Sequence, residues 1–363
     1  MSLKKFVSIS DTKPNLTGVS VHMEPPLIYY KIIELPVLLL GFACSFVFVL
    51  VMYRARCFHQ NLRIILISYA LSLLGLCTSR LMIISPLLLD YGFGLFVDNE
   101  PLCRSGKTLH DFTAFMLGTF LLPLLIERTI ATVNARIYEL CTKSSIGMLL
   151  LGIQVTAGIA MVYMNQTYAV DTSALRPCLR EYVNKYVFIV VIVFVIIINS
   201  SGIFFVWLLL YVNKRRYMTQ ISPLGERYQL CENIRSMKML FPIAAAYLTI
   251  IIVASSLLLV QFIIIPALKS RDIIARSTPA PALAFDLMVA FQTIIIPFVA
   301  FHWHRVLRLL ALNIVYRQQN RVGYIVDNKN EHKIVGLNGE SLVALSSSEE
   351  TQIYFNELAK MWS

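Results

Sequence analysis

The chain has 363 residues, of which 57% are hydrophobic and only 15% are charged, and its formal net charge is +11. An ordinary soluble domain has about 25% charged residues, so a soluble fold of this size could not cover so much apolar surface. The positive charge does not point to nucleic acid, because polytopic membrane proteins carry Lys and Arg in their cytoplasmic loops. The composition therefore excludes a soluble protein and predicts one that crosses a membrane.

Seven apolar segments follow one another along the chain, and each has about the 20 residues needed to cross a bilayer. In hydrocarbon every backbone polar group must be paired within its own segment, so all seven are predicted to be helices. The predicted spans are residues 32–53, 64–89, 109–133, 146–164, 186–212, 239–265 and 283–303. Five prolines that each permit a kink lie in or near these spans: Pro36, Pro86, Pro123, Pro242 and Pro297.

Seven spans place the two termini on opposite sides of the membrane. With the N-terminus outside, the inner segments carry 16 Lys and Arg in 74 residues, and the outer segments carry 12 in 94. This bias favours an external N-terminus, and the glycosylation acceptors Asn15 and Asn165 would then both lie outside. We predict an extracellular tail (1–31), a seven-helix bundle (32–304) and a cytoplasmic tail (305–363).

The cysteines agree with this orientation. Five of the seven fall in spans or inner segments, which leaves Cys103 and Cys178 outside. Two thiols in an oxidising space predict one disulfide. It would hold the loop after the fourth span across the outer mouth of the third, although two unrelated thiols are the alternative.

A short amphipathic segment follows the last span. Apolar side chains recur at helical spacing over residues 305–317, with arginines that can reach lipid headgroups. The apolar residues are Val306, Leu309, Leu310 and Ile314, and the arginines are Arg305, Arg308 and Arg317. This pattern predicts a helix lying along the inner membrane surface.

Several polar residues fall in the outer half of the predicted bundle, where a ligand from outside would bind. They are Arg80, His110, Asp111, Asp286 and Gln292. A lone arginine inside a span should face the interior and find a partner, so Arg80 is predicted to pair with Asp111 or Asp286. Arg80 could form an internal ion pair that orients helices or contact the ligand directly, and the sequence leaves both readings open.

The inner end of the third span carries Glu127 and Arg128. Arg128 lies 25 residues after Cys103, which is roughly 38 Å along a helix. Charges at membrane depth are costly and usually functional, although an ordinary interfacial ion pair is the alternative. We predict that Arg128 forms a latch with Glu232 or Glu226 at the foot of the sixth span. Its release would let that span swing.

Short motifs at the inner helix ends carry a resemblance to a known family. Glu127, Arg128, Ala131 and Thr132 are followed by Tyr138 and Glu139. Next come Arg227, Tyr228, Gln229, Glu232 and Asn233, and then Pro297 before His302 and Trp303. Together they resemble the nematode serpentine receptors of class epsilon, from the first span to His304.

The resemblance implies a chemosensory G-protein-coupled receptor in the plasma membrane of sensory-neuron cilia. Its implied partners are a heterotrimeric G protein, a small chemical ligand and membrane lipids. It implies no cofactor, no catalytic residue and no nucleic-acid partner.

Other functions of seven-helix membrane proteins make different demands on the sequence. A retinal-binding light sensor needs a lysine in the last span, and residues 283–303 contain none. A membrane transporter is kept as one alternative, although it should show internal repeats, interrupted helices and polar groups at the midplane, and the fourth, fifth and sixth spans are almost wholly apolar. A ligand-gated cation channel with seven helices in the inverted orientation stays as an alternative. No metal-ligand spacing or phosphate-binding loop indicates an enzyme, and His302 and His304 are better explained as interfacial residues than as metal ligands.

Overall fold

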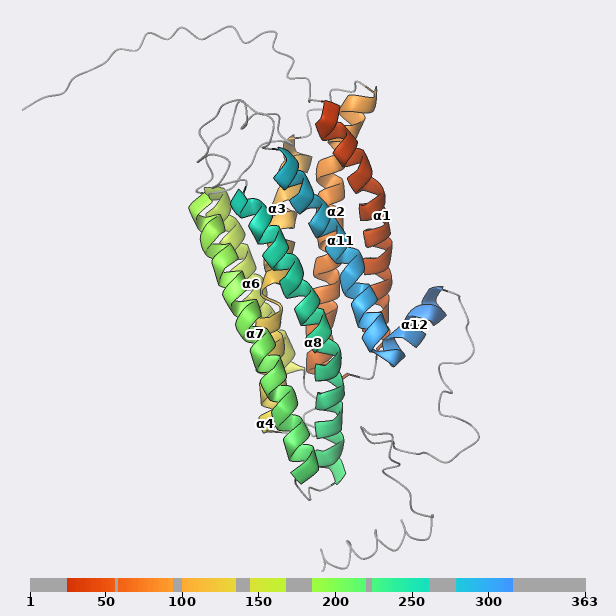
Figure 1. Cartoon of the computed structure of the whole chain (residues 1–363), viewed down its shortest axis with the longest axis vertical. Helices are drawn as coiled ribbons and strands as arrows, with labels where there is room; N and C mark the ends of the chain where they lie inside the picture. Colours follow the sequence, from red (N-terminus) through yellow and green to blue (C-terminus); the bar gives the residue numbers. More distant parts are fainter. Residues whose placement is uncertain are drawn as a thin grey trace, which may run out of the picture.

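The computed structural model describes residues 25–55, 58–93, 100–134, 144–167, 185–219, 224–260 and 279–315. Every regular element in these ranges is a helix, and together they provide seven spans long and apolar enough to cross a membrane. The spans form one elongated bundle, with a short helix crosswise at its inner end (Figure 1). The predicted all-α, seven-helix membrane fold is confirmed.

The helices extend beyond the predicted apolar segments, because hydropathy detects only the part that lies in hydrocarbon. The sixth span illustrates this, since its helix begins at Leu224 rather than near residue 239. The elements are α1 (Pro25–Arg54), α2 (Gln60–Phe93), α3 (Glu100–Gly118), α4 (Leu121–Val133), α6 (Ser145–Thr167), α7 (Lys185–Thr219), α8 (Leu224–Leu259), α11 (Pro279–Trp303) and α12 (Arg305–Val315).

The third span is broken into α3 and α4 at Thr119 and Phe120. Pro123 has no N–H with which to pair the carbonyl of Thr119. Leu122 N–H donates to that carbonyl instead, at 3.1 Å, and Phe120 N–H donates to Leu117 at 3.3 Å. Both bonds reach three residues back rather than four, so the chain tightens here and a new helix begins.

The helices pack in a defined order. Helix α1 lies against α2 and α11, α2 lies against α3 and α6, and α8 packs between α7 and α11. Leucines fill the interior, among them Leu73, Leu117, Leu124 and Leu240, none of which is more than 1% exposed. Lipid tails are as apolar as leucine, so close packing and polar contacts hold the helices together. The polar contacts therefore carry much of the specificity of this fold.

One close approach joins α2 to α6. Gly147 N–H donates to the Oδ1 of Asn61 at 3.0 Å. A Cβ on Gly147 would lie 2.8 Å from the carbonyl oxygen of Asn61, a distance that real Cβ atoms essentially never show. Glycine is required at this position because the backbone of α2 occupies the place of a side chain.

The predicted helix after the last span is present as α12. Leu307 and Ala311 are its buried residues, whereas Val306, one of the predicted apolar residues, is 42% exposed. Leu310 and Ile314 are partly buried and pack against the core. Contact with α1 and α11 sets which side of α12 faces the bundle, and its position along the membrane surface stays a prediction.

His304 stands at the junction of α11 and α12. Its Nδ1 accepts a hydrogen bond from Leu307 N–H at 3.3 Å, so the ring caps the start of α12. Its ring also lies 5.3 Å from that of Phe58. Burial, assisted by the positive charge of Arg235, lowers the pKa of His304 to about 4. The imidazole is therefore neutral at pH 7.

Candidate functional site

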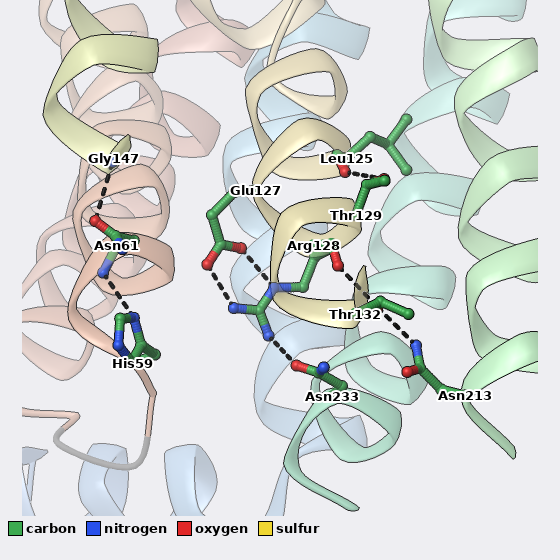
Figure 2. A network of polar contacts seen from close by, with 10 residues as sticks. All are labelled: His59, Asn61, Leu125, Glu127, Arg128, Thr129, Thr132, Gly147, Asn213 and Asn233. Carbon is green, nitrogen blue, oxygen red and sulfur yellow. Dashed lines mark hydrogen bonds and ion pairs between the residues drawn. The ribbon is translucent and has the colours of Figure 1, made fainter. Parts of the chain in front are cut away.

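At the inner end of the bundle, Arg128 joins α4 to α8. Its Nε and Nη2 donate to the two carboxylate oxygens of Glu127 at 2.5 and 2.6 Å. Its Nη1 donates to the Oδ1 of Asn233 at 3.0 Å. Figure 2 shows the guanidinium between Glu127 and Asn233. Arg128 is 1% exposed and Glu127 is fully buried, so the charges neutralise each other away from water.

One turn further along, α4 is tied to α7. The Nδ2 of Asn213 donates to the Oγ1 of Thr132 at 3.0 Å (Figure 2). Arg216 donates to the carbonyl of Thr132 at 2.8 Å. This carbonyl belongs to the last turn of α4, where backbone acceptors lack helical partners and a cation is favourable. The inner end of α4 is thus held from two sides, by α8 and by α7.

The predicted latch between Arg128 and Glu232 or Glu226 stays a prediction, and the structure adds a partner that the sequence analysis did not name. Arg128 bonds Asn233, the residue after Glu232, and the side chain of Glu232 lies outside the described residues. The same holds for the side chains of Arg227, Tyr228 and Gln229, and for Glu226, at the start of α8. Tyr138 and Glu139 also lie outside the described residues. Asn233 belonged to the family motif, but only the structure gives it a role.

In the outer half, Arg80 forms a buried ion-pair cluster. It donates to the Oε1 of Glu34 through Nη2 at 2.6 Å and through Nε at 3.0 Å. Its Nη2 also lies 2.7 Å from the Oδ2 of Asp286. The cluster joins α2 to α1 and α11. Asp286 is one of the two partners predicted for Arg80, whereas Glu34 was missed although it is an isolated acid near the start of the first span.

Asp111, the other predicted partner, belongs to a different contact. Its Oδ2 accepts a hydrogen bond from the Nδ2 of Asn165 at 3.0 Å, which joins α3 to α6. Its Oδ1 lies 3.7 Å from the Nδ1 of His110. A second bond, from Gln166 to Thr108 at 2.5 Å, reinforces the contact. Arg80 and Asp111 thus mark two separate polar contacts in the outer half.

The position of Asn165 bears on its predicted glycosylation. Asn165 lies inside α6, is 4% exposed, and uses its Nδ2 in the bond to Asp111. A glycan would be attached at this same nitrogen, and a side chain buried against α3 leaves no room for a sugar. Asn15 lies outside the described residues, and its glycosylation stays a prediction.

The remaining predicted residues occupy α3, α11 and the inner surface. Gln292 is buried on α11, 6% exposed, and Pro297 lies further along that helix. His302 and Trp303 stack edge to face at its inner end, and Trp303 is 61% exposed. That exposure is typical of an interfacial aromatic residue. Cys103 is disulfide-bonded, and Cys178 lies outside the described residues.

Among the described residues, no group of three or more His, Cys, Asp and Glu side chains could hold a metal ion. What the bundle offers is two polar regions in different halves. The outer one contains Arg80, Glu34 and Asp286, together with His110 and Asp111, and the inner one is centred on Arg128. The third span takes part in both, through Asp111 on α3 in the outer half and Arg128 on α4 in the inner half.

The comparisons with known proteins agree with this arrangement. The family model described as serpentine type 7TM GPCR receptor class ab chemoreceptor matches residues 20–276, more than half of the chain. A probable G-protein coupled receptor of Caenorhabditis elegans is 23% identical over 96% of this chain and 95% of its own length. Serpentine receptor class alpha/beta-14 of the same organism is 24% identical over 87% of this chain and 84% of its own length.

The class predicted from the sequence is therefore corrected, while the wider assignment to nematode serpentine chemoreceptors stands. The motifs at the helix ends are short, and they do not separate one class of related receptors from another. Class ab takes the place of class epsilon. The chain belongs to the family of serpentine type 7TM G-protein-coupled receptors of class ab, which are chemoreceptors.

Proposed function

We propose that this receptor binds a small external chemical in the outer half of its bundle and activates a heterotrimeric G protein from its inner face. The observation that carries the proposal is the hydrogen bond from Arg128 to Asn233, 105 residues apart in sequence. It connects the inner ends of the third and sixth spans at a buried charge. Family membership supports G-protein coupling, and we place the receptor in the plasma membrane of sensory cilia.

In this proposal the described arrangement is the resting one. Arg128 holds α8 against α4 through Asn233. An agonist must favour a second arrangement, since a ligand that binds both equally shifts nothing. Pro242, inside α8, removes a backbone hydrogen bond and offers a pivot. Movement of α8 about this pivot would break the contact with Arg128 and open an inner cavity for a helix of the G protein.

For the ligand site we propose the region of His110 on α3. The Nε2 of His110 is buried and has no hydrogen-bond partner among the described residues. A buried polar atom without a partner is costly, and a ligand that donates a hydrogen bond there would remove the cost. Arg80, by contrast, is held by two carboxylates. We therefore assign Arg80 to orienting the helices and His110 to ligand contact.

The test uses purified receptor in lipid nanodiscs with a heterotrimeric G protein and a panel of small soluble and volatile compounds. We expect at least one compound to accelerate guanine-nucleotide exchange, and Arg128→Leu to abolish the response. His110→Phe should shift the potency of that compound without altering surface abundance. Compound-gated ion current through the receptor, with no effect on nucleotide exchange, would instead establish the channel alternative.

A further inference from the structure

The break in the third span leaves two backbone carbonyls without their helical donors. In a continuous helix, Phe120 N–H would donate to Met116 and Leu122 N–H to Gly118. Here these two N–H groups donate to Leu117 and Thr119 instead. The carbonyls of Met116 and Gly118 therefore need other partners, because an unpaired carbonyl in hydrocarbon is strongly unfavourable.

Side-chain amides from two other spans fill these positions. The Nε2 of Gln154, on α6, donates to the carbonyl of Met116 at 2.8 Å and to the Oγ1 of Thr119 at 3.0 Å. The Nδ2 of Asn199, on α7, donates to the carbonyl of Gly118 at 2.8 Å. Both side chains are buried, and Asn199 is wholly inaccessible to solvent. Each amide thus pairs with a carbonyl that the break released.

The surroundings of the break are closely packed. The ring of Phe120 stacks on that of Tyr69, from α2, with centroids 3.9 Å apart. A Cβ on Gly202, in α7, would lie 3.0 Å from the side chain of Leu121, the first residue of α4. The direction in which α4 leaves the break is therefore set by contacts from α2, α6 and α7.

We propose that Thr119 and Phe120 form a hinge within the third span, and that Gln154 and Asn199 are positioning residues that fix its bend. The proposal rests on the function proposed above, since the element so positioned is α4 with Glu127 and Arg128. The outer part, α3, stays anchored by the disulfide at Cys103. Breaking the hydrogen bonds of these two side-chain amides, or exchanging their acceptors, would change the direction of α4 relative to α3.

A small change in the bend at Thr119 and Phe120 would displace Arg128 by a distance comparable to the tolerance of a hydrogen bond. Arg128 lies nine residues beyond Thr119, so a change of about 10° in the bend would move its backbone by about 2 Å, given 1.5 Å of rise per residue. A shift of that size would break the 3.0 Å bond to Asn233. The hinge therefore sets how firmly the resting contact is held.

The test compares the natural chain with Gln154→Leu and Asn199→Leu, each made with and without Pro123→Ala. An alanine at position 123 restores the N–H that can pair with the carbonyl of Thr119, so a continuous helix becomes available. The matched controls are Thr156→Val on α6 and Ser201→Ala on α7. Both are exposed hydroxyls that bond only carbonyls of their own helix.

Two measurements are made on receptor in nanodiscs. The first is the distance between the inner ends of α1 and α4. It is measured between spin labels attached to keto amino acids that replace Tyr53 and Val133, whose side chains are 71% and 67% exposed. Basal nucleotide exchange on an added G protein reports the resting contact. We expect Gln154→Leu and Asn199→Leu to shift the distance and change basal exchange by about fivefold or more. The controls should change neither, and Pro123→Ala should suppress both effects.

Equal effects of the leucine variants with and without Pro123→Ala would overturn the hinge, because the amides would then act independently of the break. So would an unchanged distance in well-folded Gln154→Leu and Asn199→Leu receptors. The distance is measured without a G protein. A receptor whose distances respond as expected but which never activates a G protein would therefore contradict the proposed function and leave the hinge standing.

Discussion

Arg128 on α4 donates to the Oδ1 of Asn233 on α8 at 3.0 Å, while the Nδ2 of the same asparagine is buried and has no hydrogen-bond partner among the described residues. Asn233 thus contributes an acceptor and leaves its donor unpaired. The contact neutralises no further charge, because Glu127 already supplies the carboxylate. The hydrogen bond between Arg128 and Asn233 is therefore specific but weaker than a second ion pair would be. A weaker bond suits a contact that must break when the receptor is activated.

Substitutions at Asn233 should therefore change resting activity in opposite directions. We expect Asn233→Leu to raise basal nucleotide exchange, because it removes the acceptor for Arg128, and Asn233→Asp to lower it, because a carboxylate binds a guanidinium more strongly. Exchange is measured per receptor at the cell surface. Ser236→Ala is the control, since Ser236 lies one turn further along α8 and is as well buried. Equal basal exchange in Asn233→Leu and Asn233→Asp would rule out this contact as the resting latch.

The outer cluster should be needed for assembly. Arg80→Gln leaves the buried carboxylate of Glu34 and that of Asp286 without their shared cation. Removing one partner of a buried ion pair destabilises by about 3–5 kcal/mol, so we expect surface abundance to fall sharply. Arg104→Gln, at an exposed arginine of α3, should have little effect. Normal abundance of Arg80→Gln with a shift in ligand potency would instead assign Arg80 to ligand binding.

The capping histidine makes stability depend on pH. The pKa of His304 is about 4 in the folded receptor against an ordinary 6.5, so the unfolded chain takes up the proton first as pH falls. The contribution of His304 to stability is complete above about pH 6.5 and declines as pH falls toward about 4. The melting temperature of purified receptor should therefore drop between pH 7 and pH 5. His304→Asn, which keeps a capping oxygen but cannot titrate, should lose this part of the drop, and an unchanged pH dependence would exclude His304 as its source.

Two glycines of α6 form a matched pair for testing the contact with α2. Gly147→Ala places a methyl group against the backbone of Asn61 and should cost about 1–3 kcal/mol of stability. Gly152→Ala meets nothing within 4 Å and should be neutral or stabilising, because alanine is the better helix former. Thermal unfolding of the two variants in the same detergent measures the difference. If both melt at the natural temperature, α2 and α6 do not approach as closely as described.

Glycosylation offers a test of the contact between α3 and α6. Because the side chain of Asn165 is buried between α6 and α3, where a sugar has no room, we expect Asn165→Gln to leave the electrophoretic mobility of the receptor unchanged. A shift on glycosidase treatment should depend on Asn15 instead, and Asn15→Gln should remove it. Loss of the shift in Asn165→Gln would mean that this asparagine leaves α6 and faces the outside.

The polar contacts were predictable to different degrees. Arg80 could be assigned a carboxylate partner from its isolation in a span, and Asp286 proved to be one of two. Gln154 and Asn199 were not identified, although an amide inside an otherwise apolar span needs a partner as much as a charge does. Arg80, Gln154 and Asn199 are all polar side chains inside apolar spans, so the sequence indicates that each needs a partner. No spacing in the sequence identifies which residue on a neighbouring helix that partner is.

The sequence by itself determined the number of spans, their order and the presence of a helix after the last span. The thickness of the bilayer and the need to pair every backbone group leave no other solution for seven long apolar segments. Only the tertiary structure decided which faces meet. Spans such as α1 and α7 are apolar all round, so their rotation cannot be read from hydrophobic periodicity. The pairing of Arg80 with Glu34 and of Arg128 with Asn233 depends on that rotation, which packing against neighbouring helices sets.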